Sequence, residues 1–231
     1  IHEYENYTCL QVPESSEEAV QINLFLQHTG GTISSRHAED ILFKNGYKLG
    51  RESLAEHDNP LQFAKEIIAQ VHGNDVSSNG VLFASSGANA FFSLFSAAYD
   101  RFLPKGKNLW IRLGWLYLDT IETMKLIAKE EDILTLHDPT DRSGLQELFS
   151  KYGNKIAGVV TEFPTNPLLQ SCDLEYVREL CDMVNAMLII DPTMASPKNS
   201  KVAELGDVIV NSLTKYASWE GDLMIGSLVF P

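Results

Sequence analysis

Apolar and polar residues follow different patterns in the two parts of this chain. Before residue 59 the apolar stretches are short and are interrupted by turn-forming pairs such as Gly30-Gly31 and Asn45-Gly46, which predicts short helices and loops without a strong period. From residue 59 onward, segments with helical spacing alternate with short, continuously apolar segments. We therefore expect an irregular N-terminal segment over residues 1–58 and a domain of regular structure over residues 59–231.

The second part predicts an alternation of helices and strands. Apolar residues in 61–71 recur at the spacing of an amphipathic helix, whereas 187–190 is apolar at every position, as a buried strand is. The same criteria predict further helices over 88–99, 118–129, 144–152 and 174–185, and further strands over 81–84, 108–113, 133–136, 156–161, 208–210 and 223–230. Such strands with helices between them are typical of a mostly parallel sheet covered on both faces. The expected fold class is α/β.

The net charge of the chain disfavours negatively charged binding partners. The 231 residues include 18 Lys and Arg against 31 Asp and Glu, which gives a formal charge of −13. A surface of this sign repels polyanions, so we expect neither nucleic acid nor an anionic membrane surface as a partner. No apolar run reaches the roughly 18 residues of a membrane-spanning helix, so we expect no integral membrane protein.

The cysteines indicate the cellular compartment, and the two ends of the chain indicate whether the sequence is part of a longer protein. Cys9, Cys172 and Cys181 have no metal-ligand spacing and lie among apolar or mixed neighbours, so we expect free buried thiols, no metal site and a reducing, cytoplasmic environment. The chain has no secretory signal, begins at Ile1 and ends at Pro231 directly after a strand-like run. We therefore expect it to be a piece of a longer protein.

Candidate functional residues follow the predicted strands, because ligands of open α/β sheets bind at the carboxyl ends of strands. Residues 85–88, Ser-Ser-Gly-Ala, join the strand at 81–84 to the next helix. Small residues there let backbone N–H groups approach an anion at the helix N-terminus, although they also suit an ordinary helix cap. No GxxxxGK or GxGxxG motif occurs, so a nucleotide-binding loop of either kind is not indicated.

Asp191 and Lys215 also follow predicted strands. Asp191 is either a residue that caps the next turn or a carboxylate that pairs with a buried cation. Lys215 lies among Ser, Thr and Tyr, and is either an ordinary exposed lysine or an amine that desolvation makes nucleophilic toward a carbonyl group.

The loop over residues 162–167 adds an asparagine to this set. Pro164 and Pro167 stiffen the loop and fix the direction of Asn166, although the loop also fits an ordinary turn. At one sheet edge the chain thus offers an amide-rich turn, an amide side chain, a carboxylate and an amine. These are the groups that pyridoxal 5′-phosphate needs for its phosphate, phenolic oxygen, ring nitrogen and aldehyde.

Four stretches of the sequence resemble the cystathionine γ-synthase and lyase group of Cys/Met-metabolism enzymes. They are TEFPTNPLLQ, MLIIDPTMASP, ELGDVIVNSLTKY and GDLMIGSLVF, and the resemblance runs from about residue 59 to residue 230. HTGGTISSRHAE and LGWLYLDT look most like the fungal cystathionine γ-synthase branch. The resemblance implies the large domain of a PLP-dependent transferase of fold type I, the aspartate aminotransferase-like fold, with the C-terminal small domain absent from this chain.

The resemblance assigns a role to each matching residue. Lys215 matches the lysine that binds the cofactor covalently, and Asp191 matches the acid that keeps the pyridine nitrogen protonated. Asn166 matches an asparagine near the phenolic oxygen, and Thr193 matches a threonine that packs against the ring. The phosphate is expected to be bound by hydroxyl groups and backbone amides at Ser212, Thr214, Ser86, Gly87 and Ala88.

The sequence departs from the family pattern in four places. Asp191-Pro192-Thr193-Met194 replaces the family's Asp-Asn-Thr-Phe. The family usually stacks a Tyr on the cofactor ring, and Leu113 stands at that place, which leaves Trp115 and Tyr117 as candidates. Trp219-Glu220 replaces a Gly-His pair. The Tyr-x-Arg that one subunit lends to its neighbour's phosphate has no clean match; the candidates for a remnant are residues 34–36 and 47–51.

The resemblance implies PLP-dependent γ-replacement, in which an activated homoserine ester and cysteine give cystathionine in transsulfuration and methionine biosynthesis. It also implies a homodimer or homotetramer that binds small amino-acid substrates. A β- or γ-lyase that breaks C–S bonds is an alternative, and so is a non-catalytic relative of the same fold. A nicotinamide-dependent oxidoreductase is disfavoured, because no glycine fingerprint follows any strand.

Overall fold

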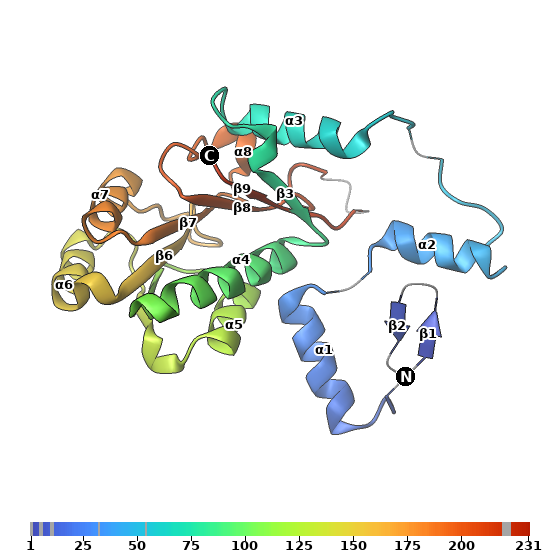
Figure 1. Ribbon diagram of the computed structural model, residues 1–231, viewed down its shortest axis with the longest axis horizontal. Coiled ribbons are helices and arrows are strands. Elements are labelled where there is room, and N and C mark those ends of the chain that lie inside the picture. Colours follow the sequence, from blue (N-terminus) through green and yellow to red (C-terminus); the bar gives the residue numbers. More distant parts are fainter. Residues whose placement is uncertain (1, 5–6, 10–11, 32, 54, 219–222) are drawn as a thin grey trace.

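The computed structural model describes residues 2–4, 7–9, 12–31, 33–53, 55–218 and 223–231 (Figure 1). Within them a seven-stranded sheet has the order β3-β9-β8-β7-β6-β4-β5. The strands are β3 (Val81–Ala84), β4 (Leu109–Leu113), β5 (Ile133–Leu136), β6 (Ile156–Glu162), β7 (Met187–Asp191), β8 (Val208–Ser212) and β9 (Gly226–Val229). Strands β4 to β8 pair in parallel with one another, whereas β9 runs antiparallel to β3 and β8. The predicted mostly parallel sheet is confirmed.

Helices cover both faces of the sheet (Figure 1). On one face lie α4 (Gly87–Phe102) and α5 (Leu118–Ile127), and on the other lie α3 (Pro60–His72), α6 (Arg142–Tyr152) and α7 (Leu174–Val184). The short α8 (Ser196–Asn199), which the sequence pattern did not predict, contacts α3. Single 3₁₀ turns occupy Ser78–Gly80, Leu103–Lys105, Glu130–Asp132 and Gly153–Lys155. Every helix and strand predicted after residue 59 is present.

Two separate hydrophobic clusters explain why the central strands are apolar at every position. Trp110 and Ile189 belong to the cluster beneath α4 and α5, where Phe95 lies 4.8 Å from Trp110 between ring centroids. Their neighbours in sequence, Ile111 and Ile190, belong to the cluster beneath α3, α6 and α7. Because successive side chains of a strand point to opposite faces, a strand covered on both sides needs apolar residues throughout.

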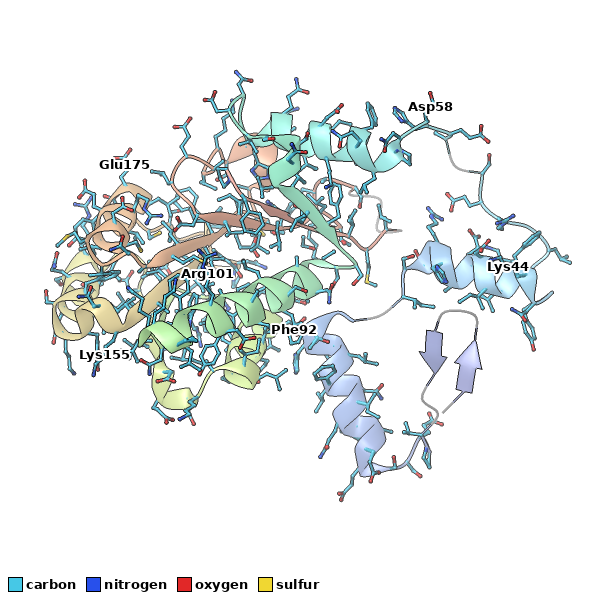
Figure 2. The ribbon with its side chains drawn as sticks, in the orientation of Figure 1. Lys44, Asp58, Phe92, Arg101, Lys155 and Glu175 are labelled. Carbon is cyan, nitrogen blue, oxygen red and sulfur yellow. The ribbon has the colours of Figure 1, made fainter. Side chains whose placement is uncertain are left out.

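The N-terminal segment contains an antiparallel hairpin of β1 (His2–Tyr4) and β2 (Tyr7–Cys9), followed by α1 (Glu17–Thr29) and α2 (Ser35–Lys44). Ser16 caps α1 by accepting a hydrogen bond from the Ala19 amide at 3.1 Å, and Gly30 ends it with φ 61°. Helix α1 contacts α4 and α5. In Figure 2, Lys44 at the end of α2 and Lys155 before β6 lie at opposite ends of the view.

Two further predictions concern the membrane and the thiols. In the part of the chain that the structure describes, none of the helices combines the length and the apolar character that crossing a membrane requires. Cys172 and Cys181 are free and buried, as predicted, and burial raises their pKa values to about 11 and about 12. The side chain of Cys9 lies outside the described residues.

Candidate active site

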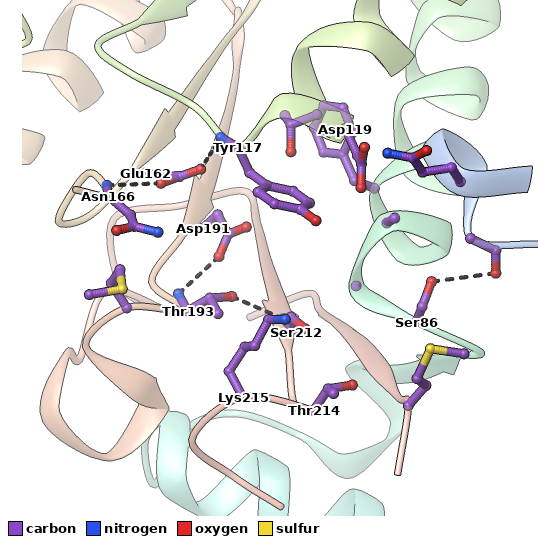
Figure 3. Close-up of a pocket in the computed structure, with 18 of the residues that line it drawn as sticks. Ser86, Tyr117, Asp119, Glu162, Asn166, Asp191, Thr193, Ser212, Thr214 and Lys215 are labelled. Atoms are coloured by element: carbon purple, nitrogen blue, oxygen red, sulfur yellow. Dashed lines mark hydrogen bonds between the residues drawn. The ribbon is translucent and has the colours of Figure 1, made fainter. Parts of the chain in front are cut away.

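A cavity of about 820 Å³ opens at the carboxyl ends of β6, β7 and β8, beside the start of α4 (Figure 3). All of the site residues predicted from the sequence line it: Ser86, Gly87, Ala88, Asn166, Asp191, Thr193, Ser212, Thr214 and Lys215. They come from four separate parts of the chain, and the parallel order of the strands brings them together. Their individual roles stay predictions.

The start of α4 forms one wall of the cavity. The Oγ atom of Ser86 accepts a hydrogen bond from the Asn89 amide at 3.0 Å, so Ser86 is indeed a helix cap. The amides of Gly87 and Ala88 in the first turn have no partner within the helix, and the positive end of the helix dipole lies here. A Cβ atom on Gly87 would lie 2.6 Å from the Cβ of Ser212, so only glycine permits this close approach. The turn therefore suits an anion.

The end of β8 and the turn that follows form a second wall. The Ser212 amide donates to Oγ1 of Thr193 at 2.9 Å, and the Ile225 amide donates to Oγ1 of Thr214 at 2.9 Å. The Lys215 amide donates to the Ser212 carbonyl at 3.2 Å, which holds the lysine in a turn. The side chain of Lys215 lines the cavity and is exposed. Of the two sequence interpretations, the structure therefore shows an exposed lysine, but one placed on the cavity wall.

Two carboxyl groups meet at the ends of β6 and β7. Glu162 and Asp191 are register partners on these parallel strands, and both line the cavity. Oxygens of Glu162 accept hydrogen bonds from the amides of Tyr117 and Asn166, and Asp191 accepts one from the Thr193 amide at 2.9 Å. Burial, and then the charge of Asp191, raises the pKa of Glu162 to about 8, and burial raises the pKa of Asp191. Such a pair favours a cation beside it.

Tyr117 supplies an aromatic ring to the cavity wall (Figure 3). Leu113, which stands at the family's stacking position, is fully buried in β4 and does not line the cavity. Trp115 is 49% exposed and does not line it either. Burial, and then the neighbouring Asp119, raises the pKa of the Tyr117 hydroxyl. Of the two aromatic candidates named from the sequence, Tyr117 is therefore the one at the site.

The sequence did not predict Glu162, Asp119 or any residue of α1 as part of the site. Nδ1 of His28 lies 2.9 Å from Oδ1 of Asp119, and Oγ1 of Thr123 donates to the His28 carbonyl at 3.1 Å, so α1 is held against α5. This contact brings Leu26, Gln27 and Gly30 to the cavity. The only signal in the sequence was the strand-end position of Glu162; nothing in it links residue 28 to residue 119.

The stretches considered for the neighbour's arginine lie away from the cavity. Arg36 pairs with Glu52, and Arg51 pairs with Asp40. None of these residues lines the cavity, and within the described residues no arginine does. Trp219-Glu220, which replaces the family's Gly-His pair, lies outside the described residues.

The chain is similar to several known proteins. The family model for Cys/Met metabolism PLP-dependent enzymes matches residues 52–230. L-2-amino-4-chloropent-4-enoate dechlorinase/desaturase of Streptantibioticus cattleyicolor is 31% identical over 221 residues, which are 95% of this chain and 44% of that protein. Cystathionine gamma-synthase of Neurospora crassa is 27% identical over 184 residues, which are 76% of this chain and 29% of that protein.

A solved structure shares the fold. Cystathionine gamma-lyase from Lactobacillus plantarum, complexed with L-serine, matches with a TM-score of 0.55 and 25% identity, over 79% of this chain and 46% of that chain. This chain therefore spans less than half the length of each of the three proteins. The fold class predicted from the sequence, the large domain of a PLP-dependent transferase, is confirmed.

The cavity residues fit the cofactor of the family, pyridoxal 5′-phosphate. The start of α4, where Gly87 approaches Ser212 closely, offers the amides of the first turn to a phosphate. Asp191 offers a carboxyl group for the ring nitrogen, and Lys215 offers an amine for the aldehyde. The cofactor predicted from the sequence is thus confirmed. With a family match over residues 52–230, this chain belongs to the Cys/Met-metabolism family of PLP-dependent enzymes.

Proposed function

We propose that this chain forms the cofactor-binding part of a γ-replacement enzyme similar to cystathionine γ-synthase, which joins an activated homoserine ester and cysteine into cystathionine. The observation that carries the proposal is that Lys215 and Asp191 line one cavity together with the start of α4. The similarity to the Neurospora crassa cystathionine gamma-synthase supports this choice of reaction.

The walls of the cavity hold the cofactor in the proposed enzyme. The amides of Gly87 and Ala88 and the hydroxyl groups of Ser212 and Thr214 bind the phosphate. Asp191 holds a proton on the ring nitrogen. Pyridoxal phosphate, when bound, supplies an electron sink that stabilises negative charge on the carbons beside the substrate amine.

The remaining residues orient the reactants and move protons. With the cofactor bound, the amine of Lys215 would take a proton from the substrate Cα and exchange protons at Cβ. Asn166 would orient the phenolic oxygen of the bound cofactor, and Thr193 would pack against its ring. Tyr117 would help to exclude water from the site.

Product analysis tests this reaction. Full-length protein, supplied with pyridoxal phosphate, an acylated homoserine and cysteine, should form cystathionine and release the acyl group. The Lys215→Ala variant should form none. Production of cystathionine at the same rate by Lys215→Ala would contradict the assigned role of the lysine.

A C–S lyase is the second candidate, and the similarity to the Lactobacillus plantarum cystathionine gamma-lyase favours it. The same cavity residues serve both reactions, because both begin by removing a proton from the substrate Cα. Pyruvate or 2-oxobutyrate together with ammonia, in place of cystathionine, would identify the lyase. A protein that stays colourless with excess pyridoxal phosphate would instead be a non-catalytic relative.

We also propose that the protein acts as a homodimer or homotetramer. Within the described residues no arginine lines the cavity, which leaves the phosphate without a basic side chain from the same α/β domain other than Lys215. Helix α1 leaves Leu24 and Phe25 exposed at 48% and 49%, surface that a second subunit can cover. Light scattering should give the mass of a dimer or tetramer; a monomer that binds the cofactor fully would contradict this proposal.

A further inference from the structure

Glu162 lines the cavity, but the proposed reaction gives this residue no role. It is the last residue of β6, and its register partner on the parallel strand β7 is Asp191, the last residue of that strand. Register partners on adjacent strands point to the same face of a sheet. The two carboxyl groups, here called the Glu162–Asp191 pair, therefore face the same cavity.

The side chain of Glu162 joins two loops of the site. It accepts the Tyr117 amide on one oxygen and the Asn166 amide at 3.3 Å on the other (Figure 3). Tyr117 precedes α5, and Asn166 lies in the loop after β6, so a single carboxyl group fixes the backbone at both lining residues. Only 8% of Glu162 is exposed.

Within the described residues, no salt bridge compensates the charge of this pair. Titratable or charged groups in the elements around Glu162 are Asp191 of β7, Tyr117 and Asp119 at the start of α5, Lys215 after β8 and Arg112 of β4. Arg112 is level with Val160, two residues before Glu162, and no ion pair joins it to Glu162. His28 of α1 is engaged with Asp119.

Two neighbouring carboxyl groups in such surroundings do not ionise together. Burial and the charge of Asp191 raise the pKa of Glu162 to about 8, although the amides of Tyr117 and Asn166 act in the opposite direction. A protonated carboxyl group still offers an acceptor on each oxygen, so both amide bonds remain compatible with a proton on Glu162. Near neutral pH the carboxyl group of Glu162 therefore keeps its proton.

We propose that Glu162 is a positioning residue that keeps one proton on the Glu162–Asp191 pair, so that Asp191 is the negatively charged member that faces the cofactor nitrogen. Glu162 also fixes the backbone at Tyr117 and Asn166. Glu162 acts through these three residues and does not touch the reacting atoms. The inference rests on the proposed function, because it needs a cofactor nitrogen beside Asp191.

The pH dependence of stability tests the proton directly. The folded chain keeps the Glu162 proton up to about pH 8, whereas the unfolded chain releases it near its ordinary value of 4.5, so the stability it confers is lost as the pH rises through this window. Between about pH 5.5 and about pH 8.5, the thermal midpoint of cofactor-free, full-length protein should fall by about 5 °C more than that of Glu162→Gln. Parallel profiles would overturn the proposal.

Glu147→Gln is the matched control, because it makes the same chemical change at an exposed residue of α6. Its profile should follow that of the wild-type protein.

If Glu162→Gln does not fold, infrared spectroscopy of the wild-type protein with isotope-labelled glutamate tests the same proton. The spectrum at about pH 7 should contain the C=O stretch of a protonated glutamic acid, and this band should disappear by about pH 9. Absence of this band at about pH 7 would overturn the proposal.

The affinity for the cofactor tests whether Glu162 positions Tyr117 and Asn166. Glutamine keeps the shape and neutral charge of protonated Glu162, but it accepts only one of the two amide hydrogen bonds because its NH2 group is a donor. Glu162→Gln should therefore bind pyridoxal phosphate more tightly than Glu162→Ala, which should bind it about tenfold more weakly than the wild-type protein. Failure of glutamine to restore the affinity lost in Glu162→Ala would overturn the proposal. A wild-type protein with the predicted pH profile but without cofactor binding would instead contradict the proposed function.

Discussion

Asp191 and Lys215 line one cavity from neighbouring strands: Asp191 ends β7, and Lys215 follows the end of β8 by a short turn. The strands are parallel, with Ile190 paired to Ile209, so their carboxyl ends lie at the same edge of the sheet. A carboxyl group and an amine in one cavity can engage the ring nitrogen and the aldehyde of the same pyridoxal phosphate.

Gly87→Ala should weaken cofactor binding. The new methyl group would lie 2.6 Å from the Cβ of Ser212, so the start of α4 and the end of β8 must move apart. Overpacking of this kind costs about 1 to 3 kcal/mol, which corresponds to a loss of affinity of about fivefold to about 150-fold if it falls on the bound state. Fluorescence titration with pyridoxal phosphate measures the loss. Gly50→Ala, with open space around its Cβ position, is the control and should bind normally.

Asp191→Asn should lower the affinity for pyridoxal phosphate by about tenfold or more, because the amide cannot form the charged hydrogen bond with a protonated ring nitrogen. Equilibrium dialysis against the cofactor measures this change. Asp100→Asn, an exposed substitution on α4, should leave the affinity unchanged. Equal affinities of the Asp191 variant and the wild-type protein would show that Asp191 does not contact the nitrogen.

His28→Ala should loosen α1. The substitution removes the imidazole that lies 2.9 Å from Oδ1 of the buried Asp119, and loss of a hydrogen bond to a buried charged group costs about 1.5 to 3 kcal/mol. Urea unfolding measures the free energy, and hydrogen exchange of the α1 amides locates the change. His137→Ala, at an exposed position after β5, is the control. Unchanged exchange in α1 would show that the contact does not hold the helix.

Cys172 and Cys181 should resist thiol reagents in the folded protein. Burial raises their pKa values to about 11 and about 12, so the reactive thiolate is scarce at neutral pH. In a Cys9→Ser background, labelling by a disulfide reagent should be at least about 100-fold slower than that of free cysteine and should become fast in denaturant. Rapid labelling of the native protein would contradict the buried placement of both thiols.

The periodicity of apolar residues predicted the regular elements well, because strands such as β7 are buried on both faces and are therefore apolar throughout. The turn at 85–88 and the strand-end positions of Asp191 and Lys215 carried enough local information to predict one edge of a site. Short α8, by contrast, spans only four residues, too few to show a helical period.

Other features depended on pairings that no local pattern specifies. Glu162 lies beside Asp191 only because β6 pairs with β7, and the sequences of the two strands do not specify that they are neighbours in the sheet. The wall from α1 depends on the contact of His28 with Asp119, two residues far apart in the chain. Tyr117 was one of two aromatic candidates, and only the folded structure shows that it lines the cavity and that Trp115 does not.

Borohydride reduction tests the central claim most directly, because it turns the bond between a lysine and pyridoxal phosphate into a stable amine. Full-length protein is incubated with the cofactor, reduced, digested and analysed by mass spectrometry. We predict that the pyridoxyl group is found on Lys215 and that Asp191→Asn reduces its yield at limiting cofactor. A protein that carries the group on another lysine, or on none, would contradict the assignment of this cavity.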